Sequence, residues 1–174
     1  MIELFKPDMY VKDIYTIDYK KLKSYGIKCI LFDLDNTLVP YFRNKPSRKI
    51  KDLIEKLKEN GFKVIIFSNS GKKRLAPFKK ILEVDCSYLS RKPFQKKFKK
   101  VLKEYKYTQS EVTMIGDQIM TDIYGGNRMG IFTVLVKPIS KKESLPTKIN
   151  RVIEKKIIKK LEKRNIFKIG EYYE

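Results

Sequence analysis

Short segments that are mostly apolar alternate with helix-like segments over residues 28–136, and this alternation limits the possible folds more than any other feature. The apolar segments cover residues 28–32, 62–67, 86–89, 112–115 and 131–136. Between them, apolar residues recur at helical spacing, most clearly over residues 47–60. Strands that are apolar on both sides are typical of a parallel sheet covered by helices on both faces. No linker interrupts the pattern, so the sequence predicts one α/β domain over residues 1–174.

Polar residues follow four of the five predicted strands. Asp33 and Asp35 follow the first strand and Ser68 and Asn69 the second, and the later strands are followed by Arg91 and Lys92 and then by Asp117. In open parallel sheets, ligands bind outside the carboxyl ends of the strands. We therefore expect these side chains to converge on one edge of the sheet and to form the functional site.

The chain contains no histidine, and this absence excludes several classes of enzyme. Ser-His-Asp and Cys-His hydrolases, phosphohistidine chemistry and histidine-bound zinc all need that side chain. Cys29 and Cys86 stand singly in apolar stretches, so we expect buried thiols and not a metal site or a disulfide. Catalysis must then use carboxylates, lysine and hydroxyl groups, with or without a hard cation that takes oxygen ligands.

The residue types at the strand ends fit the hydrolysis of a phosphate ester. Asp33 and Asp35 are two positions apart, so in an extended chain their carboxylates project to the same side. One carboxylate can attack phosphorus and form an aspartyl phosphate, and its neighbour can protonate the leaving oxygen and then activate water. Asp33 and Asp117 are candidate ligands of Mg²⁺, because carboxylates are the side chains that this cation prefers. The candidate phosphate-binding residues are Thr37, Ser68, Asn69 and Lys92, with Thr37 expected to brace the loop.

Four segments carry a resemblance to a known superfamily. DLDNT (33–37), FSNS with Ser68, RKP with Lys92 and the sequence from Gly116-Asp117 to Asp122 resemble the motifs of haloacid dehalogenase (HAD) phosphatases. More narrowly, LFDLDNTLVP, FSNS and GDQIMTDIYGGNRMG look like the YqeG family of subfamily IIIA, which is related to the mitochondrial phosphatidylglycerophosphate (PGP) phosphatases.

The resemblance implies a three-layer, Rossmann-like (HAD-like) fold and a set of roles. Asp33 would be the nucleophile and Asp35 the acid/base. Mg²⁺ would be held by Asp33, by the backbone carbonyl of Asp35 and by Asp117. Asp122 would orient Lys92 or a water of the metal instead of binding the metal directly.

The gaps between the motifs are too short for a cap domain, so we expect an open site. An open site suits a bulky or membrane-embedded phosphomonoester, and PGP is the substrate that the resemblance favours. A nucleotide, a nucleic-acid end, a sugar phosphate or a phosphoprotein stays open as the alternative substrate.

Two other functional classes compete with a phosphatase. The first is a receiver-like module in which phospho-aspartate is a signal, although receiver domains place an acidic pair before the phosphoacceptor and their lysine last. The second is a nucleic-acid-binding protein, which the net charge of +20 would suit. The chain shows no nucleic-acid motif or aromatic stacking pattern, so we do not favour nucleic acid as a partner.

Residues 147–164 predict a basic amphipathic helix with an apolar stripe at Ile149, Val152, Ile153, Ile157 and Leu161. The stripe either docks the helix on the core or lies on anionic lipid. No apolar run is long enough to span a bilayer, and the first residues lack the layout of a signal peptide. We expect a cytoplasmic protein with peripheral contact at the inner face of the membrane. The sequence leaves its oligomeric state undetermined.

Overall fold

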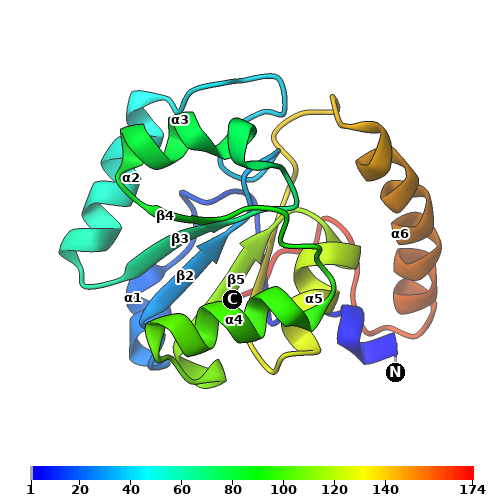
Figure 1. Ribbon diagram of the computed structural model, residues 1–174. Coiled ribbons are helices and arrows are strands. Elements are labelled where there is room, and N and C mark those ends of the chain that lie inside the picture. Colours follow the sequence, from blue (N-terminus) through cyan, green and yellow to red (C-terminus); the bar gives the residue numbers. More distant parts are fainter. Residues whose placement is uncertain (1) are drawn as a thin grey trace.

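The computed structural model describes residues 2–174, in which a parallel sheet of six strands lies between layers of helices (Figure 1). The strand order is β1-β6-β5-β2-β3-β4, and every neighbouring pair is parallel. The strands are β1 (Met9–Val11), β2 (Cys29–Phe32), β3 (Lys63–Phe67), β4 (Asp85–Ser87), β5 (Val112–Gly116) and β6 (Phe132–Val136). The predicted parallel α/β fold is confirmed. Among the six strands, only β1 was not predicted from the sequence, because this edge strand is too short to carry a periodic pattern.

Helices cover both faces of the sheet, as the apolar strands require. One face packs against α1 (Tyr19–Ser24), α2 (Arg48–Glu59) and α3 (Lys72–Leu82). The other face packs against α4 (Gln95–Tyr105), α5 (Tyr124–Asn127) and α6 (Leu145–Lys163). The remaining turns are η1 (Ile2–Phe5), η2 (Gln109–Glu111) and the π-helical turn η3 (Ile119–Ile123). The result is three layers with the core divided between the two faces.

Helix α2 shows how the sequence sets the boundaries of an element. The Ser47 hydroxyl accepts a hydrogen bond from the Ile50 amide at 3.4 Å and so caps the first turn. Ile50, Ile54 and Leu57 form its buried face. Gly61 follows with a φ of +85°, a conformation that glycine adopts at little cost where a helix ends.

The segment between β5 and β6 does not form one continuous α-helix but is divided into η3 and α5. Gly126 lies inside α5, where a Cβ would overlap the Thr133 side chain. The glycine therefore allows this short helix to pack directly on β6.

The order of the strands places a crevice between β2 and β5. From β2 the chain moves outward to β3 and β4, and it then returns to β5 on the other side of β2. Phe32 is in register with Ile115, and the Asp33 amide donates to the Ile115 carbonyl at 2.9 Å. Strand order reverses at this point, which is where doubly wound sheets bind ligands.

Helix α6 covers Leu145–Lys163, close to the predicted 147–164, and only part of its predicted apolar stripe docks on the core. Leu161 is buried and Ile157 is partly buried against the core, as expected. The rest of the predicted stripe is exposed, namely Ile149, Val152 and Ile153. The reason is that the first half of α6 turns polar side chains inward, and these contact the site described below.

Candidate active site

The two leading acids lie on either side of the crevice between β2 and β5. Asp33 follows the last residue of β2, and Asp117 follows the last residue of β5. Both side chains are buried, with 5% and 2% of their respective surfaces exposed. The neighbouring ends of β2 and β5 therefore bring together two residues that are far apart in the sequence.

Lys92 lies between two buried carboxylates. Its Nζ is 2.7 Å from Asp33 Oδ1 and 2.7 Å from Asp122 Oδ1. Burial alone would lower the pKa of Lys92, but Asp122 and Asp33 raise it, so the ammonium stays protonated. Asp122 therefore contacts Lys92, and its role in orienting that lysine or a water of the metal stays a prediction.

Asp33, Asp117 and Asp122 form a compact acidic cluster. One carboxylate oxygen from each lies within 4.8 Å of the other two. Burial raises the pKa of Asp33 to about 7 against the opposing effect of Lys92, and burial raises the pKa of Asp117 well above its ordinary value. A divalent cation with oxygen ligands fits this donor set, because it would stabilise the charged carboxylates that burial disfavours.

Gly116 makes this cluster possible. A Cβ at this position would overlap the carboxylate of Asp122. The glycine before Asp117 thus allows the end of β5 and the turn η3 to approach closely, which explains its place in the motif.

Asp35 lies at the edge of the crevice and is partly exposed. Ser70 Oγ donates to Asp35 Oδ2 at 2.8 Å, and Arg74 Nη2 is 2.6 Å from Asp35 Oδ1. Arg74 comes from the first turn of α3 and was not identified from the sequence. It fixes the orientation of the carboxylate that the sequence predicts to be the acid/base.

The four predicted phosphate-binding residues differ in their surroundings. Ser68 and Lys92 both line the crevice. Asn69 also lines it, but its side chain accepts from the Lys92 amide at 2.7 Å and donates to the Lys92 carbonyl at 3.2 Å. The Thr37 hydroxyl donates to Asp117 Oδ1 at 3.0 Å. Asn69 and Thr37 therefore hold Lys92 and Asp117 in place, and phosphate binding by either of them stays a prediction.

Arg151 of α6 is a site residue that the sequence reasoning missed. Its guanidinium pairs with Asp117 Oδ2 and donates to the Asp117 carbonyl at 2.8 Å. It also lies 2.8 Å from Glu143 Oε1 and 2.8 Å from Glu154 Oε2. One signal was available, because Arg151 is the single arginine in a helix otherwise rich in lysine and has an acid at i+3.

These groups border a hollow of about 340 Å³, which we call the catalytic cleft. One wall is formed by the ends of β2 and β3 and by Lys92. The opposite wall is formed by the start of α6 and the residues before it, with Glu143, Ser144, Pro146, Thr147 and Asn150 lining the cleft. The cleft is therefore bounded by the C-terminal helix as well as by the sheet edge.

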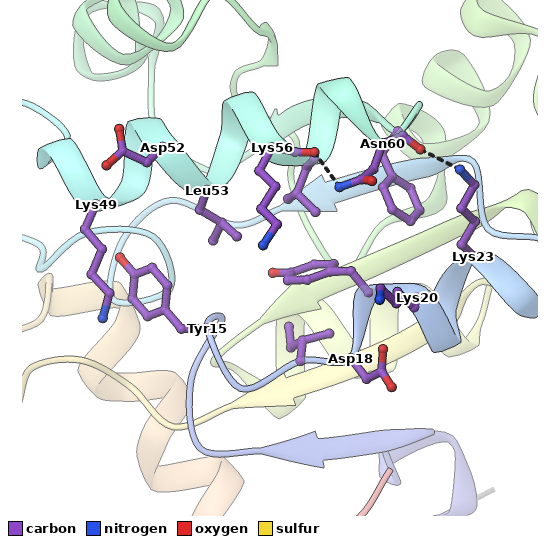
Figure 2. A pocket seen from close by; sticks show the side chains of 13 residues that line it. Tyr15, Asp18, Lys20, Lys23, Lys49, Asp52, Leu53, Lys56 and Asn60 are labelled. Carbon is purple, nitrogen blue, oxygen red and sulfur yellow. Dashed lines mark hydrogen bonds between the residues drawn. The ribbon is translucent and has the colours of Figure 1, made fainter.

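A larger hollow of about 530 Å³ lies elsewhere, between α1 and α2, and we call it the lysine groove. In Figure 2, Lys49 and Lys56 of α2 lie across it from Lys20 and Lys23 of α1. The Lys23 ammonium donates to the Asn60 carbonyl at 2.8 Å. None of the predicted site residues lines this groove.

Among residues 2–174, no helix combines the length and the apolar character needed to cross a membrane.

Known proteins are similar to this chain in sequence. The family model described as mitochondrial PGP phosphatase matches residues 2–140. The probable phosphatase YqeG of Bacillus subtilis is 36% identical over 162 residues, which span 93% of this chain and 94% of that protein. The chloroplastic/mitochondrial phosphatidylglycerophosphate phosphatase 1 of Arabidopsis thaliana is 34% identical over 79% of this chain and 42% of its own length.

Solved structures share the fold. The deoxy-D-mannose-octulosonate 8-phosphate phosphatase YrbI of Haemophilus influenzae, in its cobalt-bound form, superposes with a TM-score of 0.52. It is 16% identical over 83% of this chain and 95% of that one. At this identity the likeness concerns the fold alone.

Proposed function

Because this chain belongs to the PGP phosphatase family within the HAD superfamily and is a phosphatase, we propose that it hydrolyses the terminal phosphomonoester of phosphatidylglycerophosphate through a phospho-aspartate on Asp33. The observation that carries this proposal is the position of the Asp33 carboxylate. It lies at the end of β2, lines the catalytic cleft, contacts Lys92 at 2.7 Å and belongs to the acidic cluster.

In the first step, a carboxylate oxygen of Asp33 attacks phosphorus in line with the bond to the leaving oxygen. That bond breaks, and Asp35 gives a proton to the departing alkoxide. Arg74 and Ser70 support this assignment, because they hold the Asp35 carboxylate at the edge of the cleft. The products of the step are the alcohol and phospho-Asp33.

In the second step, Asp35 takes a proton from a water molecule that attacks phosphorus. The bond between phosphorus and Asp33 breaks, and inorganic phosphate leaves with the carboxylate of Asp33 restored. Lys92 and Ser68 hold the phosphoryl oxygens through both steps, since they line the cleft beside Asp33.

The proposal includes Mg²⁺, with the carboxylates of Asp33 and Asp117 and the backbone carbonyl of Asp35 as its protein ligands. When bound, this cation would neutralise charge on the phosphoryl oxygens and allow an anionic nucleophile to approach them. Asp122 orients Lys92, and their contact of 2.7 Å supports that role. Arg151 and Thr37 hold Asp117 from two sides.

The choice of a lipid substrate rests on the named relatives and on the shape of the site. Among the described residues 2–174, the lining of the catalytic cleft comes from the sheet edge and the start of α6, so we expect a headgroup attached to a bilayer to approach it without a cap domain in the way. A phosphatase of PGP must work at a membrane surface, so we also propose peripheral contact of a cytoplasmic protein with the membrane.

The test is a phosphate-release screen with and without Mg²⁺. PGP in mixed micelles should be hydrolysed at least about tenfold faster than nucleotide, sugar-phosphate and phosphopeptide substrates, as kcat/KM. Efficient hydrolysis of one of the others, with PGP left intact, would contradict the substrate assignment. A wild-type phospho-aspartate that persists for minutes would instead favour the receiver-like module.

A further inference from the structure

Helix α6 is built from two halves with different inner faces. The first half turns Asn150, Arg151 and Glu154 toward the catalytic cleft and its acids. The second half docks on the core through Leu161, with Ile157 and Ile158 packed beside it. The inner face of the first half is therefore polar, and that of the second half is apolar.

The outer face of the first half is apolar and has no cover among residues 2–174. The exposed fractions are 73% for Leu145, 59% for Ile149, 59% for Val152 and 42% for Ile153. These positions follow i, i+4, i+7 and i+8, so they form one contiguous face of the helix. Exposed apolar side chains that gather on one face mark an interaction surface, unlike scattered ones.

This face adjoins the mouth of the catalytic cleft. Pro146, Thr147 and Asn150 line the cleft from the same two turns that carry Leu145 and Ile149 on their outer side. Figure 1 shows α6 beside the sheet, with its first turn near the edge where the strands end. A partner that covers the apolar face would therefore lie beside the cleft that Asp33 also lines.

Positive charge surrounds the apolar face. The exposed lysines of α6 are Lys148, Lys155, Lys156, Lys159, Lys160 and Lys163. The acids of the helix do not offset them, because Glu154 is buried against Arg151 and Glu162 is only partly exposed. A second copy of the chain would place lysines against lysines in an isologous contact, so the charge favours an anionic occupant.

We propose that Leu145, Ile149, Val152 and Ile153, with the lysines of α6, form a docking face that binds the surface of an anionic phospholipid bilayer. The apolar side chains enter the region between headgroups and acyl chains, and the lysines pair with lipid phosphates. The catalytic cleft then opens at the level of the headgroups. This inference deepens the proposed function, because it gives a lipid phosphomonoester a route to Asp33. These residues lie outside the 2–140 range of the family model.

The first test measures binding without turnover. The protein is sedimented, in EDTA and without PGP, with vesicles of phosphatidylcholine alone or mixed with phosphatidylglycerol. We expect binding to the mixed vesicles that falls as salt is raised, and a partition coefficient at least about tenfold lower for the double variant Ile149→Ser/Val152→Ser. Tyr25→Ser is the matched control. Tyr25 is 51% exposed and precedes β2, so it lies where the strands begin and not where they end.

The second test separates docking from chemistry. The double variant should lose about tenfold in kcat/KM on PGP in anionic vesicles and keep its kcat/KM on the water-soluble p-nitrophenyl phosphate. Circular dichroism should show an unchanged fold, since both side chains are exposed. If wild type binds vesicles but leaves PGP intact, the proposed function fails and the docking face stands.

Three results would overturn the proposed docking to lipid. The first is a wild-type protein that does not bind anionic vesicles, and the second is a double variant that binds them as well as wild type does. The third result is a wild-type protein that is a dimer in sedimentation equilibrium and a double variant that is a monomer. The last result would assign the face to a second copy of the chain.

Discussion

The catalytic cleft and the lysine groove are both hollows, yet they differ in what their side chains do to one another. The cleft, of about 340 Å³, gathers carboxylates and Lys92 from the ends of several strands into direct contact. The groove, of about 530 Å³, is larger but lies between two helices, and two of its lysines contact a backbone carbonyl (Lys23 with Asn60) and an aromatic ring (Lys49 with Tyr15) and not a carboxylate. Size alone would identify the groove as the functional site, whereas the convergence of buried charged groups identifies the cleft.

The largest expected difference in kcat is between an Asp→Asn substitution in the cleft and the same substitution in the groove. Asp33→Asn removes the nucleophile and should lower kcat by roughly 10³-fold or more. Asp52→Asn, in the lining of the lysine groove, should change kcat by less than about twofold, because surface substitutions away from the site are nearly neutral. Phosphate release at saturating substrate measures both, and a comparable loss in the two variants would erase the distinction.

The next effect comes from removing a lysine. Lys92→Gln leaves Asp33 and Asp122 buried without their cation, which should cost about 3–5 kcal/mol of stability. Turnover should fall roughly 10²-fold or more because the phosphoryl oxygens lose a positive partner. Urea denaturation and phosphate release measure the two effects.

The control for that prediction is Lys56→Gln in the groove, which should leave both quantities unchanged. Adding Asp122→Asn to Lys92→Gln should recover part of the lost stability without recovering turnover. If Lys92→Gln were as stable as wild type, the buried ion pairs would not have the energetic role assigned to them.

A smaller effect is expected at the wall that α6 supplies. Arg151→Gln removes the guanidinium that holds Asp117, and it should raise the Mg²⁺ concentration for half-maximal activity about tenfold. Lys155→Gln on the same helix is the control and should leave that concentration unchanged, since Lys155 is exposed. Equal Mg²⁺ dependence in Arg151→Gln and wild type would show that α6 does not position the metal ligand.

The smallest effect on catalysis is expected from the floor of the groove. Leu53→Ser should reduce stability by about 1 kcal/mol, because Leu53 packs partly buried against the core, and it should leave kcat within about twofold of wild type. Urea denaturation with phosphate release under native conditions tests this. A large loss of kcat in a folded variant would give the groove a catalytic role that its geometry does not support.

More of the residues at the strand ends of the catalytic cleft could be predicted from the sequence than of the residues that the helices contribute. Asp33, Ser68, Lys92 and Asp117 each follow a strand, and parallel strands bring their carboxyl ends to one edge whatever the details of packing. Arg74 and Arg151 could not be found in this way, because their partners depend on how α3 and α6 lie against that edge. The sequence shows that these helices exist but does not determine which acid each arginine reaches.

Helix α6 also shows where periodicity stops being informative. A single apolar stripe was expected from Ile149 to Leu161, yet only its second half meets the core. The first half is held by Arg151 and Glu154 instead, a buried polar contact that leaves the apolar residues outside. A periodic pattern indicates that a helix is amphipathic, but it does not indicate which part of the protein packs against each turn.

The most direct test of the account is to locate the phosphoryl group during turnover. Asp35→Asn should slow hydrolysis of the intermediate, so brief incubation with substrate and Mg²⁺, acid quenching and peptide mass spectrometry should find one phosphoryl group on Asp33. Double substitution of Asp33 and Asp35 by asparagine should carry none. A phosphoryl group on any other residue, or full turnover by Asp33→Asn, would contradict the account.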